Sequence, residues 1–236
     1  MGFYRGPNIV TNGLVLNLDA ANVKSYPGSG TTWRDLSGNN NTGTLINGPT
    51  FSSANGGSIV FDGTNDYVAT PIQNLDRPCT FSTWVNFNNL TGFQTLIGQD
   101  TSASIIRGRF YFQKAGATSG GLILNVVNFS IVLSSNSIVI ANAINPVVTN
   151  QWYNYSAVLT TTTLALYENG ILQNTVNDSN TFLTPNTTIT LNAGYYNNSI
   201  VDYINGKSSS FQIYNRALSA SEVLQNYNAT QARFNL

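Results

Sequence analysis

Short apolar or alternating segments recur along the chain, and clusters of Gly, Asn, Pro and Ser separate them. In TFSTWVNFN apolar and polar residues alternate, and a period of two places successive side chains on opposite faces of a strand. The segments are rich in β-branched and aromatic residues, which favour strand over helix. Together they predict an all-β sandwich of many short strands. The expected strands are GLVLNLDA, SIVFDG, DYVATP, TFSTWVNFN, QTLIGQ, RFYFQK, GLILNVVN, SIVLSS, SIVIANAI, WYNYSAVLT, TLALYEN, ILQNTV, TITLNAGYY and GKSSSFQIYN.

One hairpin can be placed from its turn. The segment TLALYENGILQNTV sets Asn169 and Gly170 between two alternating runs. Both central residues of a type I′ turn require positive φ, which Asn-Gly provides. The pattern therefore predicts a two-residue turn and fixes the register of its strands.

One short helix is expected near the C-terminus. Ser219 and Glu222 have the spacing of a capping box, in which a hydroxyl and a carboxylate accept hydrogen bonds from free backbone N–H groups. Val223, Leu224 and Tyr227 would then share the face that packs on the sandwich. This interpretation gives Glu222 a structural role.

The chain has 236 residues, which fits one large all-β domain with a continuous core. No linker of distinct composition and no internal repeat divides it. We expect an N-terminal arm over residues 1–12 and a single domain over residues 13–236. Residues 22–49 form the longest turn-rich stretch, and we expect a loop that carries function or wraps the fold.

The charge pattern excludes several partners. Charged residues make up 8% of the chain, and the ten Lys and Arg residues are scattered from Arg5 to Arg233. Binding to nucleic-acid phosphates requires such residues in a cluster. No apolar run approaches the roughly 18 residues of a bilayer span, and the N-terminus lacks an apolar stretch of signal-peptide length. We therefore expect no nucleic-acid partner, no membrane insertion and no secretion pathway.

The chain has no histidine and a single cysteine. The absence of histidine removes the usual general base, the commonest metal ligand and the ordinary Ser/His/Asp and Cys/His systems. Cys79 cannot form an internal disulfide or a thiolate zinc site, so we expect a small buried apolar residue.

The carboxylates do not form a recognisable catalytic pair. Glycoside hydrolysis needs two carboxyl groups that flank the scissile bond, and the E-x-D-x-(x)-E motif of laminarinase-type sandwich enzymes is missing. Glu168 adjoins the hairpin turn, and Glu222 caps the helix. We expect no catalytic residue and no enzymatic activity. Aspartates that converge from separate loops are the alternative.

Asp62 and Asp66 flank a Gly-Thr-Asn turn in GSIVFDGTNDYVAT. Thr64, Tyr67 and Gln73 occupy the third, sixth and twelfth positions, which rules out an EF-hand loop. Two interpretations stay open. Asp62 accepts N–H bonds of its own Asx-turn while Asp66 is solvated, which needs no cofactor. Alternatively, Asp62 and Asp66 hold a calcium ion with carbonyls and an acid from another loop.

The three tryptophans are expected in different surroundings. Trp84 and Trp152 lie within apolar strands and are expected in the core. Trp33 lies in the long turn-rich stretch, and it is the candidate for an exposed platform on which a sugar ring stacks.

Seven segments resemble, in order, the laminin G-like, concanavalin A-type jelly-roll domain, over the chain from Gly13 to about Tyr227. The resemblance implies two facing antiparallel sheets. In many members it also implies recognition of carbohydrate or protein at one face or at the loop rim, sometimes with calcium. Fold alone does not settle function. The segments are GLVLNLDAAN, TTWRDLSGNNNTGTL, SIVFDGTNDYV, FSTWVNF, QWYNYSAVL, LYENGIL and FQIYNRALSASEVLQNY.

The opening MGFYRGPNIVTNGLVLNLDAANVKSYPGSGTTW is also similar to virion structural proteins of tailed bacteriophages, particularly those of marine and cyanobacterial hosts. On this resemblance we expect a non-enzymatic capsid decoration or fibre protein, assembled in host cytoplasm. Its partners would be other virion proteins, host-surface glycans and further copies in a closed homo-oligomer such as a trimer. The alternatives are a free carbohydrate-binding lectin and a glycan-cleaving enzyme.

Overall fold

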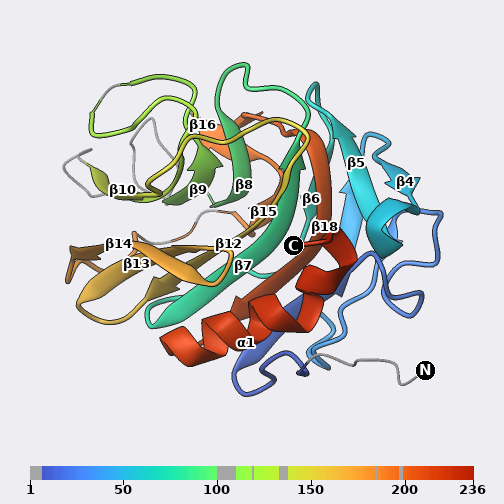
Figure 1. Cartoon of the computed structure of the whole chain (residues 1–236), viewed down its shortest axis with the longest axis horizontal. Helices are drawn as coiled ribbons and strands as arrows, with labels where there is room; N and C mark the ends of the chain where they lie inside the picture. The colour runs from blue at the N-terminus through green and yellow to red at the C-terminus, as the bar shows by residue number, and fades with distance from the viewer. Residues whose placement is uncertain are drawn as a thin grey trace.

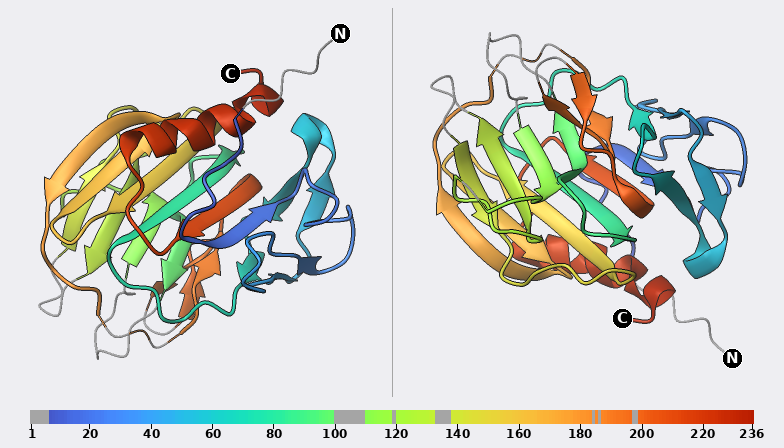
Figure 2. Two further views of the ribbon diagram at one scale, coloured as in Figure 1. Left: turned by 90° about the horizontal axis from the view of Figure 1, so that it is seen from below. Right: turned by 90° about the horizontal axis from the view of Figure 1, so that it is seen from above.

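The computed structural model describes residues 7–99, 110–118, 120–132, 138–183, 185, 187–196 and 199–236. Two antiparallel sheets face one another, and one C-terminal α-helix lies on the outside of the sandwich (Figure 1; Figure 2). The expected all-β sandwich with one short helix is therefore confirmed, in the arrangement of a concanavalin A-like jelly roll. No helix among the described residues has the length and apolarity that crossing a bilayer requires.

The first sheet has the strand order β14-β13-β12-β7-β18-β5-β4, and β1 also pairs with β18. Its centre is β7, which pairs along its length with β12 on one side and β18 on the other. The bounds are β1 (Leu14–Asp19), β4 (Thr50–Ser52), β5 (Ser58–Asp62), β7 (Cys79–Phe87), β12 (Trp152–Leu159), β13 (Thr163–Glu168), β14 (Ile171–Asn177) and β18 (Asn205–Tyr214).

The second sheet has the order β11-β10-β9-β8-β15-β6-β3-β2, and β16 pairs with β17 in a separate small hairpin. The bounds are β2 (Thr32–Trp33), β3 (Gly43–Ile46), β6 (Tyr67–Ala69), β8 (Gln94–Gln99), β9 (Phe110–Lys114), β10 (Val127–Val132), β11 (Ile138–Asn142), β15 (Thr190–Leu191), β16 (Gly194–Tyr196) and β17 (Ser199–Val201). The helices are η1 (Ala54–Gly56), α1 (Ala220–Thr230) and η2 (Gln231–Phe234).

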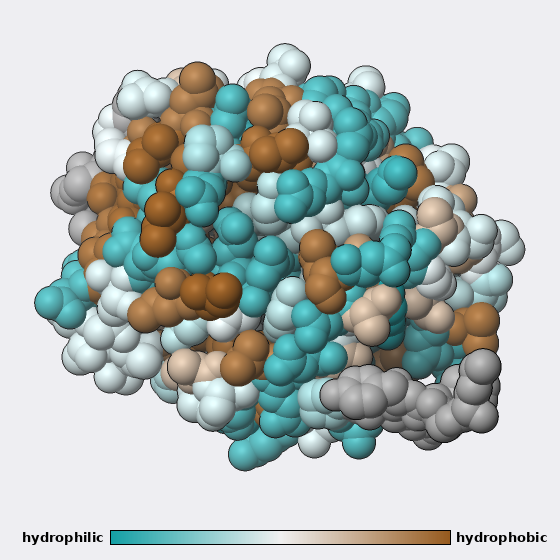
Figure 3. Space-filling view, viewed as in Figure 1, coloured by the Kyte–Doolittle hydropathy of each residue, from teal (hydrophilic) through white to brown (hydrophobic). Residues whose placement is uncertain are grey.

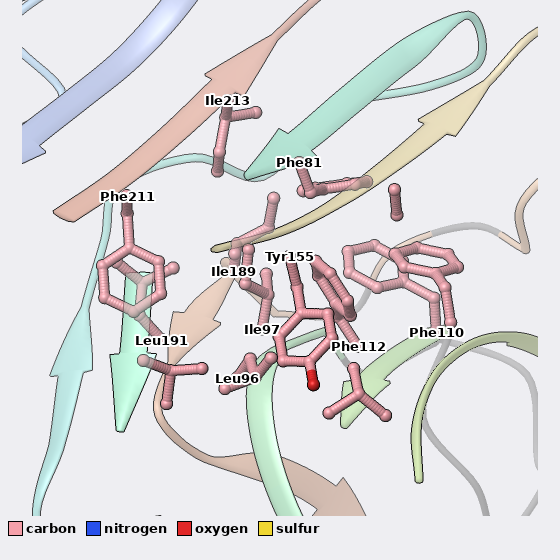
Figure 4. Close-up of a cluster of buried hydrophobic side chains, with 14 of the residues drawn as sticks. Phe81, Leu96, Ile97, Phe110, Phe112, Tyr155, Ile189, Leu191, Phe211 and Ile213 are labelled. Atoms are coloured by element: carbon pink, nitrogen blue, oxygen red, sulfur yellow. The ribbon is translucent and has the colours of Figure 1, made fainter. Parts of the chain in front are cut away.

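The main core lies between the two sheets. Figure 4 shows Phe81 of the first sheet pointing toward Phe110 and Phe112 of the second. The Phe81 and Phe110 ring centroids lie 5.1 Å apart. Cys79 is fully buried in the same cluster, as expected. Removal of this apolar surface from water is the main force that joins the layers.

The outer face of the first sheet carries a second apolar layer beneath α1 and η2. Trp84, Trp152 and Phe234 are buried together, and Tyr227 packs against them; we name these four residues the helix-side cluster. The Trp84 and Phe234 rings stack with centroids 4.1 Å apart. The burial expected for Trp84 and Trp152 is confirmed, although both lie outside the inter-sheet core.

The hairpin and the helix form as predicted. Asn169 and Gly170 have φ values of 51° and 77°, and the strands pair through a two-residue turn. Ser219 and Glu222 complete the capping box. Val223 is buried, but Leu224 is 44% exposed. The expectation that Leu224 packs on the sandwich is wrong in part, because its side chain lies at the edge of the helix, over the Gly170 turn.

Several expectations about strands are wrong, including the single strand expected for TITLNAGYY, which divides into β15 and β16. The stretch over residues 22–49 contains strands β2 and β3, so it is part of the second sheet and not a long loop. The segment GLILNVVN becomes a strand only at Val127, because Gly120, Gly121 and Asn125 adopt positive φ and turn the chain first. The error in GLILNVVN comes from glycines and an asparagine that set the chain direction locally.

Residues 8–10 pack against the sandwich. The Val10 N–H donates to Asn226 Oδ1 at 2.8 Å, and Gln225 Nε2 donates to the Asn8 carbonyl at 2.7 Å. This part of the expected arm is therefore held by α1, while residues 1–6 lie outside the described part of the chain.

Candidate functional site

Three connections meet at one end of the sandwich: the β5–β6 turn, the β7–β8 connection and the β17–β18 connection. They line an open cavity of about 320 Å³, which we name the loop-end cavity. Amide, hydroxyl, aromatic and carboxylate groups all reach it. The lining residues are Gly63, Asn89, Thr91, Phe93, Gln94, Asp202, Tyr203 and Asn205.

Gln94 and Asn205 join the three walls of the cavity. Gln94 Nε2 donates to the Asn89 and Thr91 carbonyls at 3.0 and 3.3 Å. Gln94 Oε1 accepts the Asn205 N–H at 3.0 Å. Asn205 Nδ2 in turn donates to the Asp62 carbonyl at 2.8 Å. The walls are thus held by side-chain amides, which can both donate and accept.

The Asp62–Asp66 turn closes on itself. Asp62 Oδ1 accepts the Thr64 N–H at 2.7 Å, so the Asx-turn interpretation is supported. Asp66 Oδ2 accepts the Asp62 N–H at 3.2 Å. Asp66 is 4% exposed, and burial raises the pKa of its carboxyl. The expectation that Asp66 is solvated is wrong, because its side chain folds back to the start of the turn.

Gly63 fits this turn for a steric reason. Its φ is 79°, and a Cβ there would lie 2.7 Å from Asn205 Cβ. A larger residue would push the β5–β6 turn away from the β17–β18 connection, so Gly63 lets two walls of the cavity approach closely.

The calcium interpretation of this turn stays a prediction. Calcium takes six to eight oxygen ligands, whereas one carboxylate oxygen each of Asp62 and Asp66 already accepts a backbone N–H. The carbonyls of Asp62 and Asn65 accept side-chain amides from Asn205 and Asn47. Within the described ranges no three His, Cys, Asp or Glu residues gather as a metal site. These bonds close the turn through protein donors, as the Asx-turn interpretation describes.

Lys114 supports the cavity from inside the sandwich. It ends β9 on the inner face and is fully buried. Its ammonium donates to the Leu90 carbonyl at 2.9 Å and to the Gly92 carbonyl. Lys114 therefore holds the β7–β8 connection from the core side. Burial lowers the pKa of Lys114 to about 8, and the nearby Asp202 carboxylate opposes that shift.

Asp202 and Tyr203 form the wall opposite that connection. Asp202 adopts a left-handed φ of 56°, and its carbonyl accepts the Thr95 N–H at 2.8 Å. Burial raises the pKa of the Asp202 carboxyl, and Lys114 opposes this effect. The Tyr203 ring lies 6.5 Å from that of Tyr67. A carboxylate and an aromatic ring therefore stand side by side at the cavity.

Trp33 is not an exposed platform. It is fully buried, and its ring meets Phe211 edge to face with centroids 5.9 Å apart. The expectation is wrong because Trp33 belongs to strand β2, whose side chain points into the core. Phe93 and Tyr203, both half-buried, are the aromatic residues that reach the loop-end cavity.

The two glutamates lie away from the cavity. Glu222 forms a bidentate ion pair with Arg216 at 2.9 and 2.6 Å on the helix side. Glu168 ends β13 opposite Tyr155, and burial raises the pKa of its carboxyl. Asp202 is the one carboxylate among the described lining residues. The cavity thus does not present the pair of acids that glycoside hydrolysis needs.

Sequence reasoning missed Lys114, Asp202 and the amides that join the walls. One signal was available for Lys114: in RFYFQK it alternates with two buried phenylalanines, so strand periodicity places it on the core face. Asp202 carried no comparable signal, because its role depends on a loop that meets residues more than 100 positions earlier.

Comparison with protein families gives one match. Residues 62–224 match the laminin G-like model described as the concanavalin A-like lectin/glucanases superfamily. The matched range contains every residue that lines the loop-end cavity. No curated protein sequence matches the chain.

Several solved structures share the fold. Domain 4 of AbnA, a GH43 extracellular arabinanase from Geobacillus stearothermophilus in complex with arabinotriose, is 15% identical with a TM-score of 0.68, and the match covers 91% of this chain and 98% of that one. The binding domain of Paraclostridial Mosquitocidal Protein 1 is 16% identical with a TM-score of 0.67, over 93% of this chain and 52% of that chain.

A third structure is the binding domain of Botulinum Neurotoxin DC in complex with SialylT. It is 17% identical with a TM-score of 0.66, over 94% of this chain and 52% of that chain. The chain thus spans about half the length of the two toxin domains. At these identities the likeness establishes the fold, and the similar structures are mostly binding domains.

Proposed function

The chain belongs to the concanavalin A-like lectin/glucanase superfamily, and we propose that within it the chain is a non-catalytic carbohydrate-binding module. The observation that carries the proposal is the loop-end cavity, where aromatic, amide and carboxylate groups converge. Sugars present apolar C–H faces and many hydroxyls. Aromatic rings suit the first, and amides and carboxylates suit the second.

The size and chemistry of the cavity agree with this role. Its volume of about 320 Å³ lies near the lower end of small-ligand sites, which suits the end of a glycan chain. Phe93 and Tyr203 approach from different connections, so a sugar ring can lie against one while its hydroxyls meet Asn89, Asn205 or Asp202. The single carboxylate supports binding over hydrolysis.

The test is a glycan array followed by calorimetry on each glycan that binds. Phe93→Ala and Tyr203→Ala should each weaken binding about tenfold or more, because each removes a ring from the cavity. Leu224→Ala is the matched control, since Leu224 is an exposed apolar residue on α1. Unchanged affinity in both cavity variants would contradict the proposal.

Two further measurements separate the alternatives. A chelator should leave glycan binding unchanged, because among the described residues no three His, Cys, Asp or Glu side chains gather as a metal site. A panel of polysaccharides should release no products. Product release that disappears in Asp202→Asn would instead support a glycan-cleaving enzyme.

We also propose that the module is carried on a bacteriophage virion, as a capsid decoration or fibre protein assembled in host cytoplasm. The similarity of residues 1–33 to tailed-phage structural proteins supports this assignment, as does the low content of charged residues. Hydrophobic residues form islands among hydrophilic ones on the face seen in Figure 3, a mixed surface that suits contacts with neighbouring virion subunits. Its partners would be those subunits, a host-surface glycan and further copies in a homo-oligomer such as a trimer.

Mass spectrometry and image reconstruction of purified particles test the virion assignment. The protein should be present in stoichiometric amounts and occupy a defined position with identifiable neighbours. Its absence from particles would overturn the virion role and leave the carbohydrate-binding proposal intact.

A further inference from the structure

The charges at the loop-end cavity are of one sign. Asp202 is the one ionisable acid in the lining, and none of the described lining residues is Lys or Arg. Asp62 and Asp66 lie in the turn that adjoins the cavity at Gly63. Lys114 is the nearby cation, but it is fully buried and its ammonium is directed to two backbone carbonyls. Among the described residues, a ligand in the cavity therefore meets a carboxylate and amides before any positive charge.

Asp202 is held at the cavity by its backbone. Its backbone is fixed on one side by the bond from the Thr95 N–H to its carbonyl, at 2.8 Å. Its left-handed conformation, with φ of 56°, reverses the chain between β17 and β18 and brings the residue to the cavity. An ionised carboxylate accepts hydrogen bonds and donates none, so it can receive two adjacent hydroxyls of one sugar.

Lys114 favours the charged form of this acceptor without competing for the ligand. Burial disfavours the ionised form of Asp202 and raises the pKa of its carboxyl, and the ammonium of Lys114 offsets part of that effect. Because Lys114 is fully buried, a ligand carboxylate has no open path to it. An acidic sugar would thus place its own carboxylate beside Asp202 with no compensating cation, and like charges in contact are strongly unfavourable.

We propose that the loop-end cavity binds an uncharged sugar through two adjacent hydroxyls and rejects sugars that carry a carboxylate, with Asp202 as the specificity-determining residue. This inference rests on the proposed carbohydrate-binding function and names the ligand class of the same site. It sets the chain apart from the toxin domain of similar fold that was solved with SialylT.

The experiment compares matched ligands on the full chain. A panel of neutral hexose oligosaccharides is tested by calorimetry, each beside its counterpart oxidised at C6 to the uronate. The wild-type protein should bind at least one neutral oligosaccharide and bind its uronate more than about tenfold more weakly. This ratio needs no variant, so it does not depend on whether a variant folds.

Two isosteric variants then test which residue causes the preference for the neutral sugar over its uronate. Asp202→Asn should weaken binding of the neutral sugar about tenfold or more and reduce the preference over the uronate. Asp62→Asn removes a charge at the same rim, keeps the Asx-turn and lies outside the lining, so it should change both affinities far less than Asp202→Asn does. Thermal unfolding of both variants checks that they are folded.

The possible outcomes distinguish a failure of this inference from a failure of the proposed carbohydrate-binding function. Equal or tighter binding of uronates by the wild type would overturn the ligand class and leave the carbohydrate-binding function standing. An unchanged ratio in a folded Asp202→Asn variant would overturn the role of Asp202. Failure of every neutral and acidic glycan to bind would overturn the proposed function together with this inference.

Discussion

The helix-side cluster and the loop-end cavity both contain aromatic rings, but they differ in what surrounds those rings. In the cluster, Trp84 stacks on Phe234 and Tyr227 beneath a helix and is 1% exposed. At the cavity, Phe93 and Tyr203 are half-buried beside amides and a carboxylate. The cluster is completed by the chain itself, whereas the cavity leaves ring surface open. The first arrangement stabilises the fold, and the second is suited to a ligand.

The largest expected effect is on stability. Trp84→Ala should lower the free energy of unfolding by about 3–5 kcal/mol, because it leaves a void under α1 and removes the 2.8 Å bond from Trp84 Nε1 to Thr230 Oγ1. Urea unfolding measures the change. Trp84→Phe, which keeps a ring, should cost less. Loss of glycan affinity in folded Trp84→Ala protein would show that the two regions are coupled.

At the cavity we expect a substitution to affect glycan affinity more than stability. Lys114→Met should weaken glycan binding about tenfold or more, because the Leu90 and Gly92 carbonyls lose the donor that positions the β7–β8 connection. Stability should fall by about 1–3 kcal/mol, less than in Trp84→Ala, since two carbonyls lose their donor. Lys207→Met is the matched control, because Lys207 lies in β18 outside the cavity lining. A large loss of stability with unchanged affinity would reverse this assignment.

Raising the pH should change glycan affinity and stability of the wild-type protein in opposite directions. The pKa of Lys114 is about 8 in the folded chain, against an ordinary 10.5. Between these values the unfolded chain holds a proton that the folded chain has lost, so this group makes the free energy of unfolding rise with pH. The neutral amine is a weaker donor to the carbonyls, so glycan affinity should fall through the same range.

Calorimetry and urea unfolding at about pH 7 and about pH 9.5 measure both quantities. The control is Lys114→Arg, whose guanidinium stays protonated and should remove the dependence of affinity on pH. The same alkaline loss of affinity in Lys114→Arg would contradict the role of Lys114.

The smallest effect is expected at the helix cap. Ser219→Ala removes the side chain that accepts the Glu222 N–H, and it should cost about 1 kcal/mol of stability. Ser221→Ala, at an exposed position in the same turn, should cost less. Glycan affinity should be unchanged in both, because the helix lies apart from the cavity lining. Chemical unfolding and calorimetry on the same samples test this.

The sequence predicted the elements that depend on residues close together in the chain. The Asn169-Gly170 turn, the Ser219 capping box and the strand expected in TFSTWVNFN each depend on residues within a few positions of one another, and the structure confirms them. Strands β2 and β3 were missed because each is shorter than the window over which alternation is visible. Trp33 was misjudged for the same reason.

The candidate site depended on contacts that no local pattern contains. Asp62 and Asp66 were recognised as a turn, but the burial of Asp66 and the approach of Asn205 come from the pairing of β18 with β5. The sequence by itself determined the sandwich, its hairpin and its helix, because periodicity and turn chemistry act over short separations. Only the tertiary structure brought Lys114, Gln94 and Asp202 to one end of the sandwich, because sheet pairing joins residues that are far apart in the chain.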